Sequence, residues 1–423
     1  MKAYIKTYGC TLNQADGDII KSQLLASGID VAASEADADV VVLNTCTVKE
    51  QTQIRIVQKM HSLGASGKKL VVTGCMASAN PDIVRKHAPH ASIASIHNIG
   101  SFAHVVSEAA AGSRLEMLSQ KQFDRVSLYR PGGGAIARIP VNDGCLSSCA
   151  FCETKRARGK LNSFSEESII KAVQLSAAKG AKEIEITSQD IGAYGKDRGT
   201  SIIELMYKIS KLDGDFMVRI GMMNPEHLSH YIDDFISALS DRKFYKFAHI
   251  PIQSGSERVL SLMGRNGCTP SEFADIVSRM RKAFPDMSIE TDIIVGFPGE
   301  TEADFDKTIE LLKQARPDVT NVSRFTKRPH ARASKMVQLP PKEINSRSIE
   351  ASRTVREIQA EINSRFVGRD MELLATEKGD GFNVCRDVNY RHAIIHSGSI
   401  QVGTKLFARA VSSSSYSIIC EPY

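Results

Sequence analysis

The sequence has 423 residues, which is enough for two to four domains, and a formal net charge of +6, which permits a nucleic-acid partner without requiring one. No apolar run approaches the ~18–20 residues of a membrane span, and the first residues lead directly into a strand-like pattern. We therefore expect a cytoplasmic protein with neither membrane segment nor signal peptide. Its nine cysteines favour metal or redox chemistry over disulfides.

Residues 1–112 alternate strand-like and helix-like stretches, which predicts an open parallel α/β sheet. Predicted strands at residues 3–8, 39–43 and 69–73 each end just before a cysteine, and these are Cys10, Cys46 and Cys75. Because the carboxyl ends of parallel strands share one edge of a sheet, we expect the three thiols to converge. A shared metal site explains this repetition better than three separate buried cysteines, which remain the alternative.

Residues 113–134 are polar and aperiodic and end in Pro-Gly-Gly-Gly, so we predict a linker there. From residue 135 onward, strand-like runs alternate with helix patterns, and residues 269–272 have the form of a capping box. Six such repeats predict a partial (β/α)6 barrel, whose chemistry would lie at the carboxyl ends of its strands. The predicted strands cover residues 137–141, 183–187, 216–221, 247–252, 289–295 and 319–325.

Cys145, Cys149 and Cys152 lie in one short loop after the first of these strands. Their C-x-x-x-C-x-x-C spacing can hold three irons of a cubane cluster, which usually takes four thiolates, and it leaves one iron open. Structural zinc takes four ligands, usually from paired C-x-x-C motifs, and the nearest histidines are His104 and His227. The spacing therefore favours an iron–sulfur cluster over a zinc site and over three unrelated core cysteines.

After residues 340–341, both proline, a long helix is predicted, with one apolar stripe that we expect to pack on the barrel. The stripe consists of Ala351, Val355, Ile358, Ile362 and Phe366. Short strands separated by glycines then predict a small antiparallel β-barrel. Its strands are expected at residues 371–376, 382–385, 392–395, 405–411 and 417–420. The domains expected are 1–112, 113–134 as linker, 135–366 and 367–423.

Several motifs, taken together, resemble the radical S-adenosylmethionine methylthiotransferase family over essentially the whole chain. They occupy residues 7–13, 44–48, 74–76, 145–152, 249–256 and 292–300. Residues 152–159 and 187–195 are most similar to the archaeal and eukaryotic branch, which acts on threonylcarbamoyladenosine beside the anticodon of transfer RNA. Residues 328–331, Arg-Pro-His-Ala, depart from the short turn usual in the family. Eukaryotic members carry a C-terminal membrane anchor, whereas we expect none before Tyr423.

The resemblance implies two 4Fe–4S clusters, one on Cys10, Cys46 and Cys75 and one on the Cys145 loop, together with S-adenosylmethionine. One molecule of S-adenosylmethionine would supply a methyl group and another a radical, and carbon 2 of the adenine would receive a methylthio group. A flavodoxin or ferredoxin would donate electrons, and no membrane partner is expected. Residues 367–423 are similar to the TRAM domain, an RNA-binding barrel. Cofactor contacts are expected from Gln189, Arg219, Gln253 and Gly296, for which a structural role is the alternative.

Two basic stretches near the predicted barrel mouth are candidates for binding RNA phosphates, with a solvated basic face as the alternative. The first contains Lys155, Arg156 and Arg158, and the second contains Arg324 and Arg328. The expected partner is the anticodon stem-loop of a transfer RNA. The runner-up function is the same chemistry on isopentenyladenosine in transfer RNA or on a ribosomal-protein aspartate. A different class altogether is an RNA-binding module with structural or redox-sensing clusters.

Overall fold

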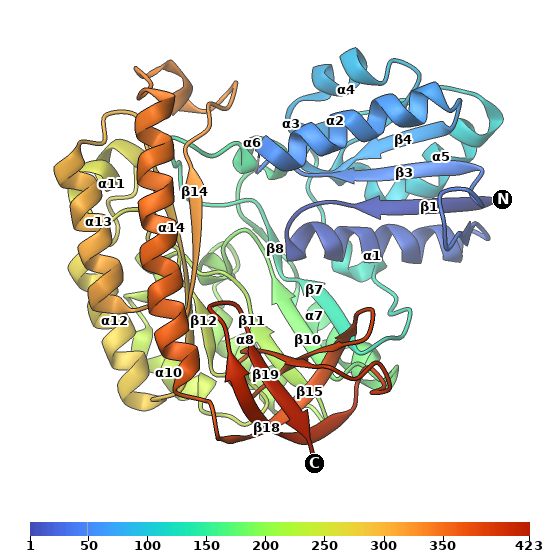
Figure 1. Cartoon of the computed structure of the whole chain (residues 1–423). Coiled ribbons are helices and arrows are strands. Elements are labelled where there is room, and N and C mark those ends of the chain that lie inside the picture. Colours follow the sequence, from blue (N-terminus) through green and yellow to red (C-terminus); the bar gives the residue numbers. More distant parts are fainter. Residues whose placement is uncertain (49) are drawn as a thin grey trace.

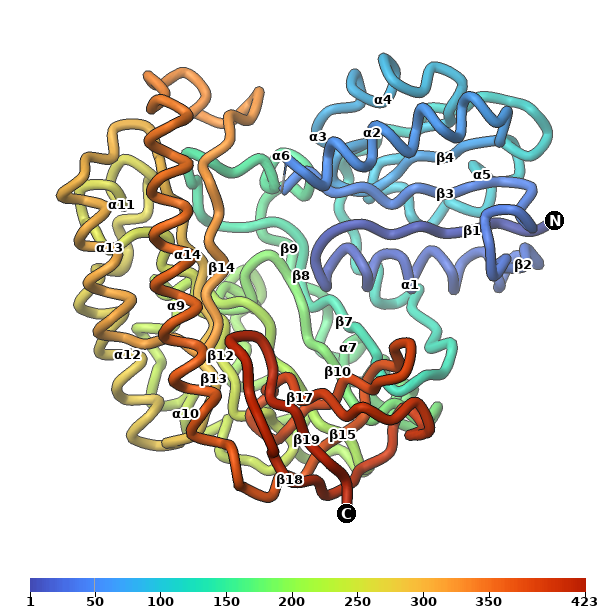
Figure 2. The backbone as a smooth tube through the Cα atoms, viewed as in Figure 1, coloured from blue at the N-terminus to red at the C-terminus, as the bar shows by residue number. Residues whose placement is uncertain are grey.

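The structure, a computed structural model, describes residues 1–48 and 50–423. An N-terminal α/β sheet stands beside the upper end of a central parallel barrel, and a small C-terminal β-barrel lies at the lower end (Figure 1). The tube view shows the same arrangement, with the N-terminal part in blue and the C-terminal barrel in red (Figure 2). The three predicted folded units are therefore present as an α/β sheet, a partial barrel and a closed β-barrel.

The N-terminal sheet is six-stranded and wholly parallel, in the order β2-β1-β3-β4-β5-β6. Its central strand β3 is buried throughout and apolar over its first four residues, because both faces are covered. Val40 and Val42 pack with helices α1 and α5, whereas Val41 and Leu43 pack with α2 and α4. The strands are β1 Lys2–Thr7, β2 Asp30–Val31, β3 Val40–Thr45, β4 Lys69–Thr73, β5 Ser92–Ala94 and β6 Glu116–Met117. The helices are α1 Thr11–Ala26, α2 Glu50–Ala65, α3 Gly74–Ala79, α4 Pro81–His87, η1 Ile96–Ser101 and α5 Phe102–Ala111.

Residues 113–134 are more ordered than a plain linker. Strand β6 pairs with β5 at the edge of the N-terminal sheet, and the short helix η2, Arg125–Leu128, follows it. Arg125 is buried to 1% exposure. Polar composition alone conceals this packing, because an arginine in an aperiodic stretch is usually exposed.

Six parallel strands form the central barrel, as predicted, in two groups with the orders β7-β10-β11 and β12-β13-β14. The groups are joined where Val218 donates its N–H to the Lys243 carbonyl at 2.6 Å. In the described residues no pairing joins β7 to β14, so the barrel is open on that side. The strands are β7 Ile136–Pro140, β10 Glu183–Thr187, β11 Met217–Ile220, β12 Phe247–His249, β13 Ser288–Val295 and β14 Val319–Arg324, with β8 Asn142–Asp143 and β9 Asn162–Ser163 pairing separately.

Helices cover the outside of the barrel, and their starts follow the capping signals in the sequence. The helices are α6 Thr154–Arg158, α7 Glu166–Ala178, η3 Ile191–Ala193, α8 Ile202–Ser210, α9 Pro225–Leu228, α10 Ile232–Leu239, α11 Glu257–Met263, α12 Pro270–Ala283, α13 Glu302–Ala315 and η4 Arg332–Lys335. The long helix α14, Pro341–Ser364, runs along β14 (Figure 1). Four residues of its predicted stripe, from Ala351 to Ile362, are buried in the core of the central barrel, which confirms that the helix packs there. The fifth, Phe366, lies beyond the end of α14 and packs in the core of the C-terminal barrel instead.

The C-terminal strands close into the predicted small barrel in the order β15-β16-β17-β19-β18. They are β15 Asp370–Lys378, β16 Asn383–Arg386, β17 His392–Ile395, β18 Lys405–Ser413 and β19 Ile418–Pro422. This barrel contacts residues at or just before the beginnings of the central strands. Lys246 donates its N–H to the Val388 carbonyl at 2.9 Å, and Arg391 reaches Ser288 at 2.6 Å. It therefore covers the amino-terminal end of the central barrel, away from the cysteine loop.

Among residues 1–48 and 50–423, no helix has both the length and the apolar character needed to cross a membrane.

Candidate active site

Cys10, Cys46 and Cys75 come together at the carboxyl edge of the N-terminal sheet. Cys10 precedes α1, Cys46 follows β3, and Cys75 lies in the first turn of α3. A Cβ atom on Gly9 would lie 2.8 Å from the Cys46 sulfur, so a glycine with its φ of +104° is needed there. Burial raises the pKa of the Cys75 thiol to about 11; Arg158 opposes the rise, and Cys46 and Cys10 add to it. The expected convergence of the three strand ends is thus present in the fold.

Arg158 links this cysteine group to the barrel. Its Nε donates to the Cys75 sulfur at 3.3 Å, and its guanidinium pairs with Asp16 at 2.5 Å and with Asp143 at 3.4 Å. Arg125 pairs with the same two carboxylates, with Asp16 at 2.8 Å. All four charged side chains are buried, and two positive charges balance two negative ones. A balanced buried quartet of this kind fixes the position of the N-terminal domain against the barrel.

The Cys145 loop is held by its own neighbours after β7. Lys155 donates to the carbonyls of Leu146 at 3.2 Å and Ser147 at 3.1 Å, which closes the loop on itself. The Thr154 N–H points to the Cys152 sulfur at 3.3 Å. Burial raises the pKa of Cys145 to about 11 and also raises that of Cys149, which Arg265 opposes. The loop therefore presents three cysteines from a fixed backbone.

Each cysteine group offers three thiols, the number that can bind three irons of a cubane cluster and leave the fourth iron open. A cluster spreads its thiolates more widely than a single metal ion does, because each cysteine binds a different iron. The nine cysteines form no disulfide. Nitrogen donors also approach sulfur in both groups, from Arg158 to Cys75 in one and from the Thr154 N–H to Cys152 in the other, as suits thiolate ligands.

A cavity of about 880 Å³ lies beside the cysteine loop, where the barrel meets the N-terminal domain. Cys152 lines it directly, and Thr47, next to Cys46, lines it from the N-terminal domain. The remaining wall comes from the ends of the last barrel strands and from α14. Its other lining residues include Val48, Glu50, Phe151, Glu153, Gln253, Asp292, Asn321, Arg324, Lys327, Arg328, Ile344 and Asn345. This volume suits a nucleoside-sized substrate.

Glu153 is a site residue that the sequence interpretation missed. Its buried carboxylate accepts hydrogen bonds from Thr47 at 3.0 Å, Asn80 at 3.2 Å and the His330 N–H at 3.2 Å. It thus joins the N-terminal domain, the cysteine loop and the segment after β14 at the cavity wall. The available signal was its position directly after Cys152, as the single carboxylate at the start of a basic run.

Gln189 and Gln253, two of the residues predicted to contact the cofactor, have features that suit this role. Gln189 follows β10, and its buried Oε1 has no hydrogen-bond partner among the described residues, so it can accept a hydrogen bond from a bound molecule. Gln253 lines the cavity and has a φ of 77°, a conformation that is strained for a residue with a side chain. Their contact with S-adenosylmethionine stays a prediction.

The structure places Arg219 away from the barrel mouth and gives Gly296 a packing role, beside which cofactor contact stays a prediction. Arg219 lies against Phe247 at 4.9 Å and Tyr390 at 5.2 Å, near the amino-terminal end of the barrel, whereas the cysteine loop lies at the carboxyl end. Neighbouring carboxylates already balance its charge, so it is not placed to pair with a cofactor at the mouth. A Cβ on Gly296 would meet Ile344 of α14 at 2.6 Å, so helix packing alone already requires a glycine there.

The residues predicted to contact RNA differ in how exposed their side chains are. The prediction for Arg158 is wrong, because its side chain is fully buried in the quartet. Arg328 is also buried and faces the cavity, and Lys155 is occupied by the cysteine loop. Arg156 and Arg324 are exposed, and RNA contact remains a prediction for them.

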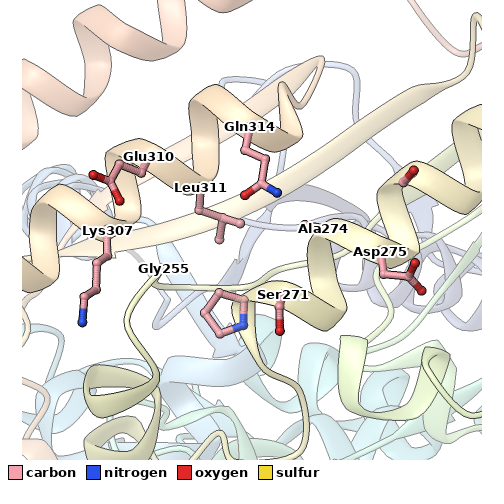
Figure 3. Close-up of a pocket in the computed structure, with 10 residues that line it drawn as sticks. Gly255, Ser271, Ala274, Asp275, Lys307, Glu310, Leu311 and Gln314 are labelled. Atoms are coloured by element: carbon pink, nitrogen blue, oxygen red, sulfur yellow. The ribbon is translucent and has the colours of Figure 1, made fainter.

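A second hollow of about 430 Å³ lies between α12 and α13 on the outside of the barrel (Figure 3). Lys307 and Glu310 on one helix and Asp275 on the other line it. It contains none of the cysteines and none of the predicted site residues, so the cavity beside Cys152 is the candidate active site.

Two family models match separate parts of the chain, and known proteins match most of it. Residues 2–95 match the uncharacterized protein family UPF0004, and residues 139–312 match the radical SAM superfamily. A probable threonylcarbamoyladenosine tRNA methylthiotransferase of Pyrococcus horikoshii is 38% identical over 94% of this chain and 94% of its own. The Archaeoglobus fulgidus protein of the same name is 39% identical over 95% and 94%. The Homo sapiens threonylcarbamoyladenosine tRNA methylthiotransferase is 31% identical over 93% of this chain and 69% of its own.

Among solved structures, the radical S-adenosylmethionine methyltransferase TsrM from Kitasatospora setae has a similar fold. The TM-score is 0.58 at 14% identity, covering 79% of this chain and 76% of that one. This similarity extends the fold assignment beyond the barrel alone.

Proposed function

Because this chain belongs to the threonylcarbamoyladenosine tRNA methylthiotransferase family of radical SAM enzymes, we propose that it methylthiolates carbon 2 of threonylcarbamoyladenosine beside the anticodon of transfer RNA. The observation that carries the proposal is the cavity that Cys152 lines from the barrel and that Thr47, next to Cys46, lines from the N-terminal domain. We infer that one adenine bound there is reached from both groups. The relatives' names favour this nucleoside over isopentenyladenosine and over a ribosomal-protein aspartate.

Cys145, Cys149 and Cys152 would hold one 4Fe–4S cluster with an open iron for S-adenosylmethionine. Cys10, Cys46 and Cys75 would hold the second. The bound cofactors supply one-electron cleavage of S-adenosylmethionine, which yields a carbon radical able to remove an unactivated hydrogen atom, and the sulfur and methyl group that replace it. Ordinary acid–base groups are poorly suited to that hydrogen, because it is not acidic.

The side chains of the protein hold the two cysteine groups in position and exclude water from the cavity. Lys155 fixes the backbone of the Cys145 loop, and Arg158 fixes Cys75 relative to the barrel. Gln189 offers its unpaired Oε1 to the amino group of S-adenosylmethionine. Glu153 joins the walls of the cavity where the two domains meet, so that solvent is kept from a reactive radical.

The partner that follows from this proposal is the anticodon stem-loop of a transfer RNA, with Arg156 and the TRAM-like barrel as RNA contacts. The electron donor is proposed to be a flavodoxin or a ferredoxin. We expect the enzyme to act in the cytoplasm, where transfer RNA and such donors are found together.

The test is a reconstitution of the protein under anaerobic conditions, followed by incubation with reductant, S-adenosylmethionine and transfer RNA that carries threonylcarbamoyladenosine. Nucleoside mass spectrometry should show the 2-methylthio derivative, and chromatography should show 5′-deoxyadenosine. Cofactor cleavage without any methylthiolated nucleoside would contradict the proposed substrate. If neither product forms in a fully reconstituted sample, the proposed reaction class is itself contradicted.

A further inference from the structure

Three cationic side chains line one wall of the active-site cavity without a carboxylate partner. Arg324 ends β14, and Lys327 and Arg328 follow it. In the described part of the chain none of the three forms an ion pair. Arg324 donates to the amide oxygen of Asn345 at 2.6 Å, and Arg328 donates to the Val48 carbonyl at 2.6 Å and to Gln53 at 3.1 Å. All of these acceptors are neutral.

Most of the other deeply buried arginines have an anionic partner. Arg125, Arg158, Arg347 and Arg391 each pair with at least one carboxylate, whereas Arg386 lies over the Tyr390 ring at 4.6 Å. Arg328 is only 8% exposed, and the carboxylates that act on its charge, Glu153 and Glu50, lie beyond ion-pair distance. Glu153 is already occupied by Thr47, Asn80 and the His330 N–H. Since a desolvated guanidinium is costly without an anion, this wall is suited to an anionic ligand.

The substrate in the proposed function carries such an anion. A threonylcarbamoyl group ends in a carboxylate, whereas an isopentenyl group is apolar and uncharged. The group is attached to the exocyclic nitrogen of adenine, which points away from carbon 2. An adenine with carbon 2 toward the cysteines therefore directs its substituent toward another wall of the cavity.

We propose that Arg324 and Arg328 bind the carboxylate of the threonylcarbamoyl group and so select this nucleoside. The inference rests on the proposed function and deepens it. Guanidinium groups suit carboxylates because they can donate two parallel hydrogen bonds. The basic wall is thus assigned to substrate selection rather than to the RNA phosphates.

The experiment compares two anticodon stem-loop RNAs, one with threonylcarbamoyladenosine and one with the methyl ester of the same group, which removes the charge. Their dissociation constants and their kcat/KM for methylthiolation are measured with the full-length reconstituted enzyme. The wild type should prefer the acid over the ester by about ten- to a hundredfold, the range of one or two charge-assisted hydrogen bonds. Arg324→Gln and Arg328→Gln should each reduce this preference, and the double variant should bring it close to one.

Lys335→Ala is the matched control, because it removes an exposed charge from the same segment outside the cavity and should keep the wild-type ratio. Arg328→Lys should recover part of the preference if charge matters. General damage to the fold lowers affinity for both RNAs and leaves the ratio unchanged. Equal binding of acid and ester by the wild type, or an unchanged ratio in the double variant, would overturn the inference. Failure of the wild type to methylthiolate the acid RNA would instead count against the proposed function.

Discussion

At the scale of single residues, Arg158 connects the two halves of the active site. It contacts a cysteine of one group and pairs with Asp143, two residues before the first cysteine of the other. Its partner Asp16 lies 142 residues away in sequence. The six cysteines could be selected from spacing and strand ends alone, but Arg158 stands in a basic run that is typical of a surface. Nothing local in the sequence shows that two distant carboxylates bury it.

Arg158→Met should destabilise the protein by about 3–5 kcal/mol, because it leaves Asp16 and Asp143 buried with one cation instead of two. The measurement is the shift in the guanidinium unfolding midpoint of the metal-free protein. Lys160→Met, two positions later and exposed, is the control and should lie within about 0.5 kcal/mol of the wild type. Equal midpoints for the two variants would show that the quartet contributes little.

Arg156 is the residue of the first basic stretch that is still predicted to contact an RNA phosphate, because Arg158 is buried. Arg156→Ala should weaken transfer-RNA binding and reduce the slope of log affinity against log salt by about one. Arg279→Ala, on the outer helix α12 and paired with Asp233, should change neither. An Arg156 variant with the wild-type slope would remove this residue from the RNA interface.

At the scale of elements, the C-terminal barrel also packs against the amino-terminal end of the central barrel and closes it. The turn between β16 and β17 places the Tyr390 ring against Phe247, and its hydroxyl donates to Glu185 at 2.9 Å. Tyr390 holds a φ of 64°, which is unusual for an aromatic residue and is kept by these contacts. The strands of both barrels follow from alternating patterns and glycines. The docking of one on the other does not, because it depends on residues from separate domains.

Tyr390→Ala should therefore destabilise the protein by about 2–3 kcal/mol, because it removes a ring and a hydrogen bond from the junction. Tyr390→Phe keeps the ring and should cost about 1 kcal/mol through the lost bond to Glu185. Limited proteolysis between residues 364 and 370 should accelerate in the alanine variant. If the alanine variant were as resistant as the wild type, the two barrels would not depend on Tyr390 for docking.

At the scale of the whole molecule, Cys152 of one domain and Thr47, next to Cys46 of the other, line one cavity. The Cys145 loop lies beyond the first strand of the barrel, and the other group lies at the edge of a separate sheet. Strand-end reasoning predicts each group within its domain. It cannot predict that the two edges meet, because that depends on the Arg125–Asp16–Arg158–Asp143 quartet and on Glu153, whose partners are far apart in sequence.

Two occupied groups would give about eight irons per chain after anaerobic reconstitution. Cys268, Cys385 and Cys420 are buried away from both groups, so changing each to Ser should leave the iron content unchanged. About four irons in a well-reconstituted sample would mean that one group holds no cluster.

The most direct test separates the roles of the two groups. A triple change of Cys10, Cys46 and Cys75 to Ala should abolish the methylthiolated nucleoside and leave 5′-deoxyadenosine formation largely intact, because the Cys145 loop supplies the radical on its own. Changing Cys145, Cys149 and Cys152 to Ala should abolish both products. Nucleoside mass spectrometry of the RNA and chromatography of the small molecules measure them together. Continued formation of methylthiolated nucleoside by the N-terminal triple variant would contradict the central claim that the two groups act together on one adenine.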